Sequence, residues 1–100
     1  MIGIDITRVS RFKKVSQRFV QNVLHQDEIK EFDKLESDQK PKFLATRWAI
    51  KEALFKADNK YSCFNEVLIK KSPEGRYVFL DFEISTSDEG NLLIAIVLKK

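Results

Sequence analysis

The stretch Arg47-Trp48-Ala49-Ile50-Lys51-Glu52-Ala53-Leu54-Phe55-Lys56-Ala57 has the spacing of an α-helix with one small-residue side. Alanines recur every four residues at positions 45, 49 and 53, and Glu52 and Lys56 share a side with the first two. Because alanine carries a single methyl group, another backbone segment can approach this side closely. We therefore expect a helix from about Lys42 to Asp58 that holds Glu52 near a close packing contact.

The opening strand supplies a second carboxylate. Side chains alternate between the two faces of a strand, so over residues 2–7 the isoleucines share one face, while Gly3, Asp5 and Thr7 share the other. Asp5 therefore points away from the apolar face, beside a residue that has no side chain. A carboxylate on each element, Asp5 on the strand and Glu52 on the helix, can hold one hard cation.

Simpler interpretations of the same residues stay open. Glu52 and Lys56 stand four residues apart with the acid first, which favours a solvent-exposed helix pair worth about 0.2–0.5 kcal/mol. Asp5 can instead cap a following helix, as can Thr7 and Ser10. A metal site requires that the two carboxylates converge, which neither alternative does.

The composition indicates one globular domain that covers residues 1–100. Hydrophobic residues make up 43% and charged residues 33%, which excludes a disordered or fibrous chain. No apolar run approaches the roughly 20 residues of a membrane helix, so we expect no membrane partner. The start lacks a secretory signal and Cys63 has no disulfide partner, which favours a reducing cytoplasm. A chain this short buries a modest fraction of its surface, so a homo-oligomer is expected.

Positive charge is concentrated near the start of the chain. No acidic residue lies between Thr7 and Gln26, and the basic residues of this stretch are Arg8, Arg11, Lys13, Lys14 and Arg18. Such a stretch favours an anionic partner, although a solvated basic face without a partner fits equally well. Nucleic acid is the weaker choice of partner, because the aromatic residues here belong to an apolar stripe and offer no stacking platform.

The remaining periodicity predicts an α+β domain with an N-terminal strand, three helices and then an antiparallel meander. The first helix is expected from Val9 to His25, and the second is expected to be capped by Asp27. Alternation of period two then predicts strands over residues 66–70, 76–86 and 92–98. The last strand is apolar on both sides, so it should lie centrally or against a neighbouring subunit.

Several catalytic motifs are missing. The sequence has no Gly-rich phosphate loop, no paired Cys or Cys/His metal spacing and no nucleophile elbow. His25 is the sole histidine and stands at a predicted helix end, where a surface or capping role is expected rather than a catalytic one.

Two blocks of the sequence resemble a known family. The opening Gly3-Ile4-Asp5-Ile6-Thr7, with Arg11 after it, and the later block from Phe43 to Ala57 resemble the holo-[acyl-carrier-protein] synthases, the small bacterial 4'-phosphopantetheinyl transferases. The segment Val23-Leu24-His25-Gln26-Asp27-Glu28 is also similar to a helix junction of that family, so the resemblance extends over about residues 2 to 57. It implies a 4'-phosphopantetheinyl transferase-like fold and a homotrimer with coenzyme A bound between subunits.

The resemblance also implies a reaction. A serine of apo acyl carrier protein attacks the β-phosphate of coenzyme A in the presence of Mg²⁺, takes the 4'-phosphopantetheine group and releases adenosine 3',5'-bisphosphate, a step in fatty acid biosynthesis. Asp5 and Glu52 would ligate the Mg²⁺, and Lys56 would act beside them as a catalytic cation. The remaining expected contacts are with the pyrophosphate for Lys51, with the nucleotide phosphates for Arg47, Lys40 and Lys42, and with the acidic carrier protein for Arg11, Lys14 and Arg18.

The chain departs from the family pattern in four places. Arg8 stands where a glutamate is common, Asp58-Asn59-Lys60-Tyr61 replaces a Gly-Thr-Gly loop, and the region after Gly75 is shortened. Asp88 stands in place of a histidine that meets pyrophosphate. Its charge can repel the ligand, it can be recruited toward the cation or a neighbouring lysine, or it can belong to an ordinary exposed hairpin turn over residues 88–91. The alternative function is a non-catalytic basic module that binds an acidic protein through the first helix, for which Asp5 and Glu52 need not converge.

Overall fold

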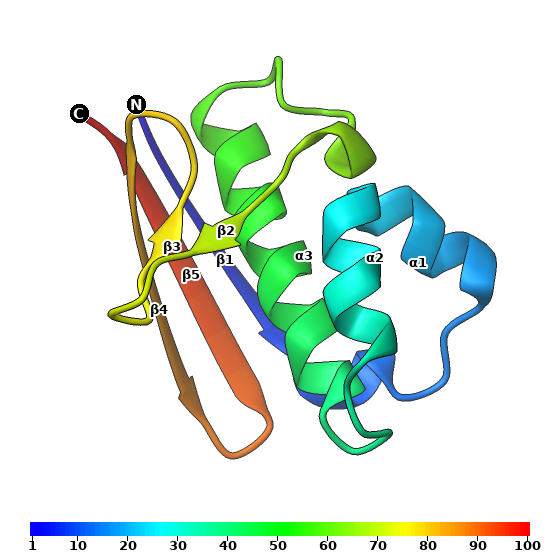
Figure 1. Ribbon diagram of the computed structural model, residues 1–100. Helices are drawn as coiled ribbons and strands as arrows, with labels where there is room; N and C mark the ends of the chain where they lie inside the picture. The colour runs from blue at the N-terminus through cyan, green and yellow to red at the C-terminus, as the bar shows by residue number, and fades with distance from the viewer.

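An antiparallel sheet of three strands carries one long helix across one of its faces in the computed structural model, which describes residues 1–100 (Figure 1). The strands are β1 (Ile2–Arg8), β4 (Phe82–Glu89) and β5 (Leu92–Lys99), and they lie in the order β1-β5-β4. The helices are α1 (Gln17–Val23), α2 (Gln26–Asp33) and α3 (Lys40–Ala57). The predicted α+β class is confirmed, with β5 in the centre of the sheet.

The small-residue side of α3 lies directly on β1. A Cβ atom added to Gly3 would stand 1.8 Å from the carbonyl oxygen of Ala53, so only glycine fits at this crossing. Ala49 and Ala53 have no exposed surface, and Leu93, Ala95 and Val97 of β5 are buried on the same side of the sheet. The close approach predicted from the alanine spacing is confirmed, and it brings the polar face of β1 against α3.

The first helix is shorter than predicted. Val9–Phe12 form a 3₁₀ turn, η1, and α1 begins only after Ser16, whose Oγ accepts a hydrogen bond from the backbone N–H of Phe19 at 3.0 Å. The prediction of one helix over residues 9–25 was wrong because both pieces bury their apolar residues in the same cluster, around Phe12 and Val20. A continuous apolar stripe therefore hid the break.

The second helix, α2, begins two residues earlier than predicted. His25, not Asp27, is its N-cap, because His25 Nδ1 accepts from the backbone N–H of Asp27 at 3.1 Å. Glu28 completes a capping box by accepting from the backbone N–H of His25 at 2.9 Å. The capping role expected for His25 is confirmed.

The segment between α3 and β4 contains little of the predicted strand. Residues Phe64–Glu66 form a second 3₁₀ turn, η2, followed by two short strands, β2 (Lys70–Lys71) and β3 (Tyr77–Val78). Ile69 is buried, but its backbone N–H donates to Glu28 Oε2 at 3.1 Å and not to a strand partner. The strand predicted over residues 76–86 is interrupted at Leu80, whose φ of 47° breaks the extended chain.

The face of the sheet away from α3 is open and apolar. Side chains that alternate with the buried ones on β1 and β5 are between 38% and 60% exposed, and they are Ile2, Ile4, Ile6, Leu92, Ile94, Ile96 and Leu98. We call these seven residues the outer aliphatic face. Patches of this kind on a small protein mark an interaction site.

None of the helices combines the length and the apolar character that crossing a membrane requires.

Candidate active site

The contact between β1 and α3 gathers the charged residues predicted to carry the chemistry. Asp5 points from β1 toward α3, where Lys56 Nζ donates to Asp5 Oδ1 at 3.2 Å and to the carbonyl oxygen of Ile4 at 3.0 Å. The Asp5 side chain is only 13% exposed. Lys56 therefore pairs with Asp5 across the two elements, and not with Glu52 along the helix as the simpler interpretation proposed.

Glu52 also lies at the contact between β1 and α3. Burial raises the pKa of Glu52 above its ordinary value of 4.5, and the negative charge of Asp5 raises it further, while Lys56 and Arg11 oppose the shift. Glu52 stands one helical turn before Lys56 on the same side of α3, and Lys56 is bonded to Asp5, so the two carboxylates approach each other at this contact. The structure thus brings together Asp5, Glu52 and Lys56, the three residues predicted to be catalytic.

Oxygen ligands for a hard cation are present at this point. Asp5 Oδ2 is buried and has no hydrogen-bond partner, while Oδ1 is bonded to Lys56. No group of three or more His, Cys, Asp or Glu side chains gathers anywhere in the chain. Mg²⁺ is commonly held by one or two carboxylates together with substrate phosphates and water. The pair of carboxylates fits such an ion when a phosphate ligand supplies further oxygens.

Arg11 belongs to the edge of this site. Its Nη1 donates to Thr7 Oγ1 at 3.0 Å, and its guanidinium lies 5.5 Å from the ring centre of Phe12 and 5.8 Å from that of Trp48. Its charge also lowers the pKa of Glu52. The other two residues predicted to contact the carrier protein, Lys14 and Arg18, are exposed farther along the same segment.

The prediction that Lys51 meets the pyrophosphate is wrong. Its side chain is fully buried, and its Nζ donates to Glu28 Oε1 and to the carbonyl oxygens of Val23 at 2.8 Å and Phe64 at 3.0 Å. All three N–H groups of the ammonium are therefore used inside the protein. Adjacent helix positions differ by about 100° in direction, so Lys51 points away from the side that carries Glu52.

Glu28 is the residue that sequence reasoning missed. It is 1% exposed, and it connects the start of α2 with Lys51 of α3 and with the backbone of Ile69. Burial lowers the pKa of Lys51, and the Glu28 carboxylate opposes this shift. The position of Glu28 three residues after the cap His25 was the available signal, because a capping box places a carboxylate there.

Arg47 and Lys42 line one cleft of about 500 Å³ beside α3. Arg47 is 3% exposed, lies 4.2 Å from the ring centre of Phe43 and forms ion pairs of 3.6 Å with Glu28 and Glu31. Lys42 lies at the rim, where its Nζ stands 3.2 Å from Asp88 Oδ2. Asp88 has thus been recruited toward a neighbouring lysine, one of the possibilities left open by the sequence.

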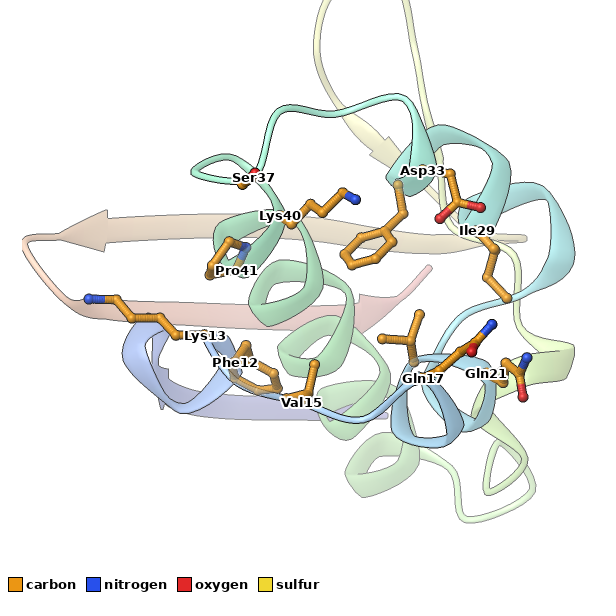
Figure 2. Close-up of a pocket in the computed structure, with 12 residues that line it drawn as sticks. Phe12, Lys13, Val15, Gln17, Gln21, Ile29, Asp33, Ser37, Lys40 and Pro41 are labelled. Atoms are coloured by element: carbon orange, nitrogen blue, oxygen red, sulfur yellow. The ribbon is translucent and has the colours of Figure 1, made fainter.

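Lys40 is separated from these two cations. It lines a different cleft, between the segment 12–21 and the start of α3 (Figure 2). Its Nζ lies 5.2 Å from the ring centre of Phe32. The predicted grouping of Lys40 with Arg47 and Lys42 is therefore wrong. Residues that stand two positions apart in a helix point in directions about 200° apart. Lys40 and Lys42 therefore lie on opposite sides of α3.

Comparison with known proteins gives the family of the chain. The family model for the 4'-phosphopantetheinyl transferase superfamily matches residues 1–97. A holo-[acyl-carrier-protein] synthase of Mycoplasma mobile is 48% identical over all of this chain and 89% of that protein. The chain belongs to the holo-[acyl-carrier-protein] synthase family. A second synthase of this family, from Mycoplasmopsis pulmonis, is 46% identical over 99% of this chain and 89% of its own length.

Solved structures of the holo-[acyl-carrier-protein] synthase family have the same fold. The synthase from Bacillus anthracis in complex with CoA (3',5'-ADP) superimposes with a TM-score of 0.86 at 26% identity, covering 96% of this chain and 91% of that one. The Helicobacter pylori synthase in complex with coenzyme A superimposes with a TM-score of 0.77 at 27% identity, and the match covers 98% of each chain. The family predicted from the two sequence blocks is confirmed, and the protein is a transferase of that family.

Proposed function

We propose that this transferase moves the 4'-phosphopantetheine group of coenzyme A to a serine of apo acyl carrier protein and releases adenosine 3',5'-bisphosphate. The observation that carries the proposal is the convergence of Asp5, Glu52 and Lys56 at the contact between β1 and α3. A non-catalytic basic module has no use for two carboxylates that repel each other in a partly buried place.

Asp5 and Glu52 would hold Mg²⁺, which when bound supplies positive charge against the pyrophosphate. The chain itself contributes Lys56. Two of its three N–H groups bond Asp5 and Ile4, and its side chain is 51% exposed, so the third N–H remains for a phosphoryl oxygen. The bond to Asp5 orients the ammonium before the ligand arrives, and such preorganised charge is the main contribution of a protein to phosphoryl transfer.

The nucleotide end of the ligand would bind in the cleft beside Arg47 and Lys42. These residues stand five and ten positions before Glu52, which corresponds to about 8 and 15 Å along the axis of α3. An extended ligand such as coenzyme A can span this distance. Arg47 would form part of the cleft wall, because Glu28 and Glu31 already hold its guanidinium, while Lys42 is exposed enough to reach a phosphate.

The carrier protein would approach over the basic segment that contains Arg11, Lys14 and Arg18. Exposed charges of this kind mainly raise the rate of encounter with an acidic partner. Of the three, Arg11 is the residue whose charge lowers the pKa of Glu52, so the serine of the carrier protein would enter beside it. We place the reaction in the cytoplasm, where the free thiol of Cys63 stays reduced.

The outer aliphatic face would be the contact between copies in a homotrimer. Seven exposed aliphatic side chains on two neighbouring strands form an apolar surface, and interfaces between identical subunits are more apolar than the rest of a protein surface. The edge strand β4 borders this face and also carries Asp88 near the cleft, so a neighbouring copy would lie close to the bound nucleotide.

The reaction is tested by mass spectrometry of apo acyl carrier protein incubated with coenzyme A, Mg²⁺ and the enzyme. We expect the carrier protein to gain the mass of the 4'-phosphopantetheine group with the wild-type chain, and to gain none with Asp5→Ala or Glu52→Ala. Asp81→Ala, which removes an exposed carboxylate from a distant turn, serves as the control. Binding of the carrier protein without any gain of mass would instead identify the chain as a basic binding module.

A further inference from the structure

Lys42, which lines the cleft that holds Arg47, forms an ion pair with a residue outside that cleft. Lys42 on the first turn of α3 meets Asp88 on β4 at 3.2 Å, although 46 positions separate them in sequence. Asp88 shares a row of the sheet with Leu93 and Thr7, and Leu93 is buried toward α3. The Asp88 side chain therefore stands on the helix-facing side of the edge strand, in reach of α3.

The turn that follows Asp88 is fixed in place. Asn91 bonds η1 three times, through Val9 N–H to the Asn91 carbonyl, Ser10 N–H to Asn91 Oδ1, and Asn91 Nδ2 to Ser10 Oγ, each at 2.9 Å. Asp88 itself lies within the ladder between β4 and β5. These backbone and side-chain hydrogen bonds hold the backbone of Asp88 near the start of α3.

Among the cations of this cleft, Lys42 is the one that a ligand can bind by replacing a weakly bound partner. Arg47 is buried and paired with Glu28 and Glu31, and the third cation, Lys71, lies 5.3 Å from the ring centre of Tyr77. The side chains of Lys42 and Asp88 are 59% and 43% exposed, and ion pairs this exposed are weak.

The position of the pair matches one end of the proposed ligand. Asp5 and Asp88 lie two strands apart across the sheet and two residues apart along it, which corresponds to about 12 Å between their Cα atoms. An anion at Lys42 is therefore a different group from the pyrophosphate at Asp5. Coenzyme A carries such a second group in the phosphate monoester on its ribose, and the released nucleotide keeps it.

We infer that Asp88 competes with this ribose phosphate for the ammonium of Lys42, and so limits how tightly the enzyme holds both coenzyme A and adenosine 3',5'-bisphosphate. This inference rests on the proposed function. A phosphate dianion is a stronger acceptor for an ammonium than a carboxylate, so the ligand displaces Asp88 from Lys42. The anchored carboxylate then remains next to the phosphate and repels it. Limited affinity for the product nucleotide favours its release.

The experiment is calorimetric titration of adenosine 3',5'-bisphosphate, with Mg²⁺, into the wild type, Asp88→Asn, Lys42→Met and the double variant. Asp88→Asn should bind about two- to fivefold more tightly than the wild type at low salt, and less so at high salt. In the Lys42→Met background the Asp88→Asn change should have much less effect. Asp33→Asn, which removes one exposed negative charge beside the other cleft, is the matched control and should leave affinity unchanged.

The outcomes separate this inference from the proposed function. A wild type that neither binds the nucleotide nor modifies the carrier protein overturns both. A wild type that binds and transfers, with Asp88→Asn equal to it, overturns the inference alone. Weaker binding by Asp88→Asn also overturns it, because Asp88 would then position Lys42 for the phosphate and not compete with it. Transfer kinetics should show the same preference as a lower KM for coenzyme A in Asp88→Asn.

Discussion

At the scale of single residues, the negative charge of Glu52 in the active site makes the fold less stable, because the carboxyl is partly buried beside Asp5. Because burial and Asp5 raise the pKa of Glu52, the folded metal-free chain binds a proton at this carboxyl more readily than the unfolded chain does. Stability of the metal-free protein should therefore increase as pH falls from above the raised pKa toward the ordinary value of 4.5. Over the same interval, protonation removes a ligand of the cation, so transfer should decline.

Glu52→Gln tests this opposition between stability and function. The amide removes the repulsion with Asp5, so the metal-free variant should melt at a higher temperature than the wild type near neutral pH, while transfer is lost. Mg²⁺ with coenzyme A should raise the melting temperature of the wild type more than that of the variant. Thermal unfolding with and without these ligands measures both effects. A variant that melts lower than the wild type in the absence of ligands would contradict this assignment.

For the buried Lys51 we expect the opposite result, a loss of stability without a loss of transfer. Lys51→Met should destabilise the fold by about 3–5 kcal/mol, because the Glu28 carboxylate and two carbonyl groups lose their shared donor inside the protein. Urea unfolding measures the loss, and the double change with Glu28→Gln should recover part of it. The folded fraction of Lys51→Met should still transfer the group, since Lys51 has no access to the ligand. Normal stability with a specific loss of transfer would support the contact with pyrophosphate that the sequence predicted for Lys51.

At the scale of the elements, the sequence was most informative where one spacing has one structural meaning. The alanine spacing of α3 predicted its close approach to β1. The meeting of Asp5 with Glu52 was one of several interpretations of the spacing, and the family resemblance was needed to prefer it. Prediction was wrong where local and tertiary preferences act on the same residues. The apolar stripe predicted for the first helix continued through the break at Ser16. Ile69 is a residue type that favours strands, but its backbone N–H donates to Glu28 and not to a neighbouring strand. The relations among Lys42, Asp88 and Arg47 depend on packing between distant elements, which no local spacing expresses.

The contact between β1 and α3 gives a test at this scale. Gly3→Ala should destabilise the protein by at least about 1–3 kcal/mol, because its new methyl group would meet the immovable carbonyl of Ala53. Gly90→Ala is the matched control: its φ of 58° strains any side chain, but nothing lies within 4 Å of the added atom. It should therefore cost only about 1 kcal/mol. Chemical unfolding compares them, and equal losses would mean that the helix does not lie as close to β1 as described.

At the scale of the whole molecule, the two faces of the sheet have different tasks. The inner face holds α3 and the active site, while the outer aliphatic face exposes side chains that a protein of 100 residues gains little by leaving in water. A neighbouring copy on that face would add buried surface and a second wall near the nucleotide cleft. Assembly and activity should consequently depend on each other.

Ile96→Lys tests this dependence. Ile96 lies on the outer side of the central strand, opposite Ile4, so a lysine there would place an unpaired charge in the middle of the proposed interface. Light scattering after size-exclusion chromatography should show trimers for the wild type and monomers for the variant, and transfer should fall with assembly. Leu80→Lys, at an exposed position outside the sheet, is the control and should leave both unchanged. A monomeric wild type with full transfer would show that one chain forms the complete site, and the outer aliphatic face would then serve another partner.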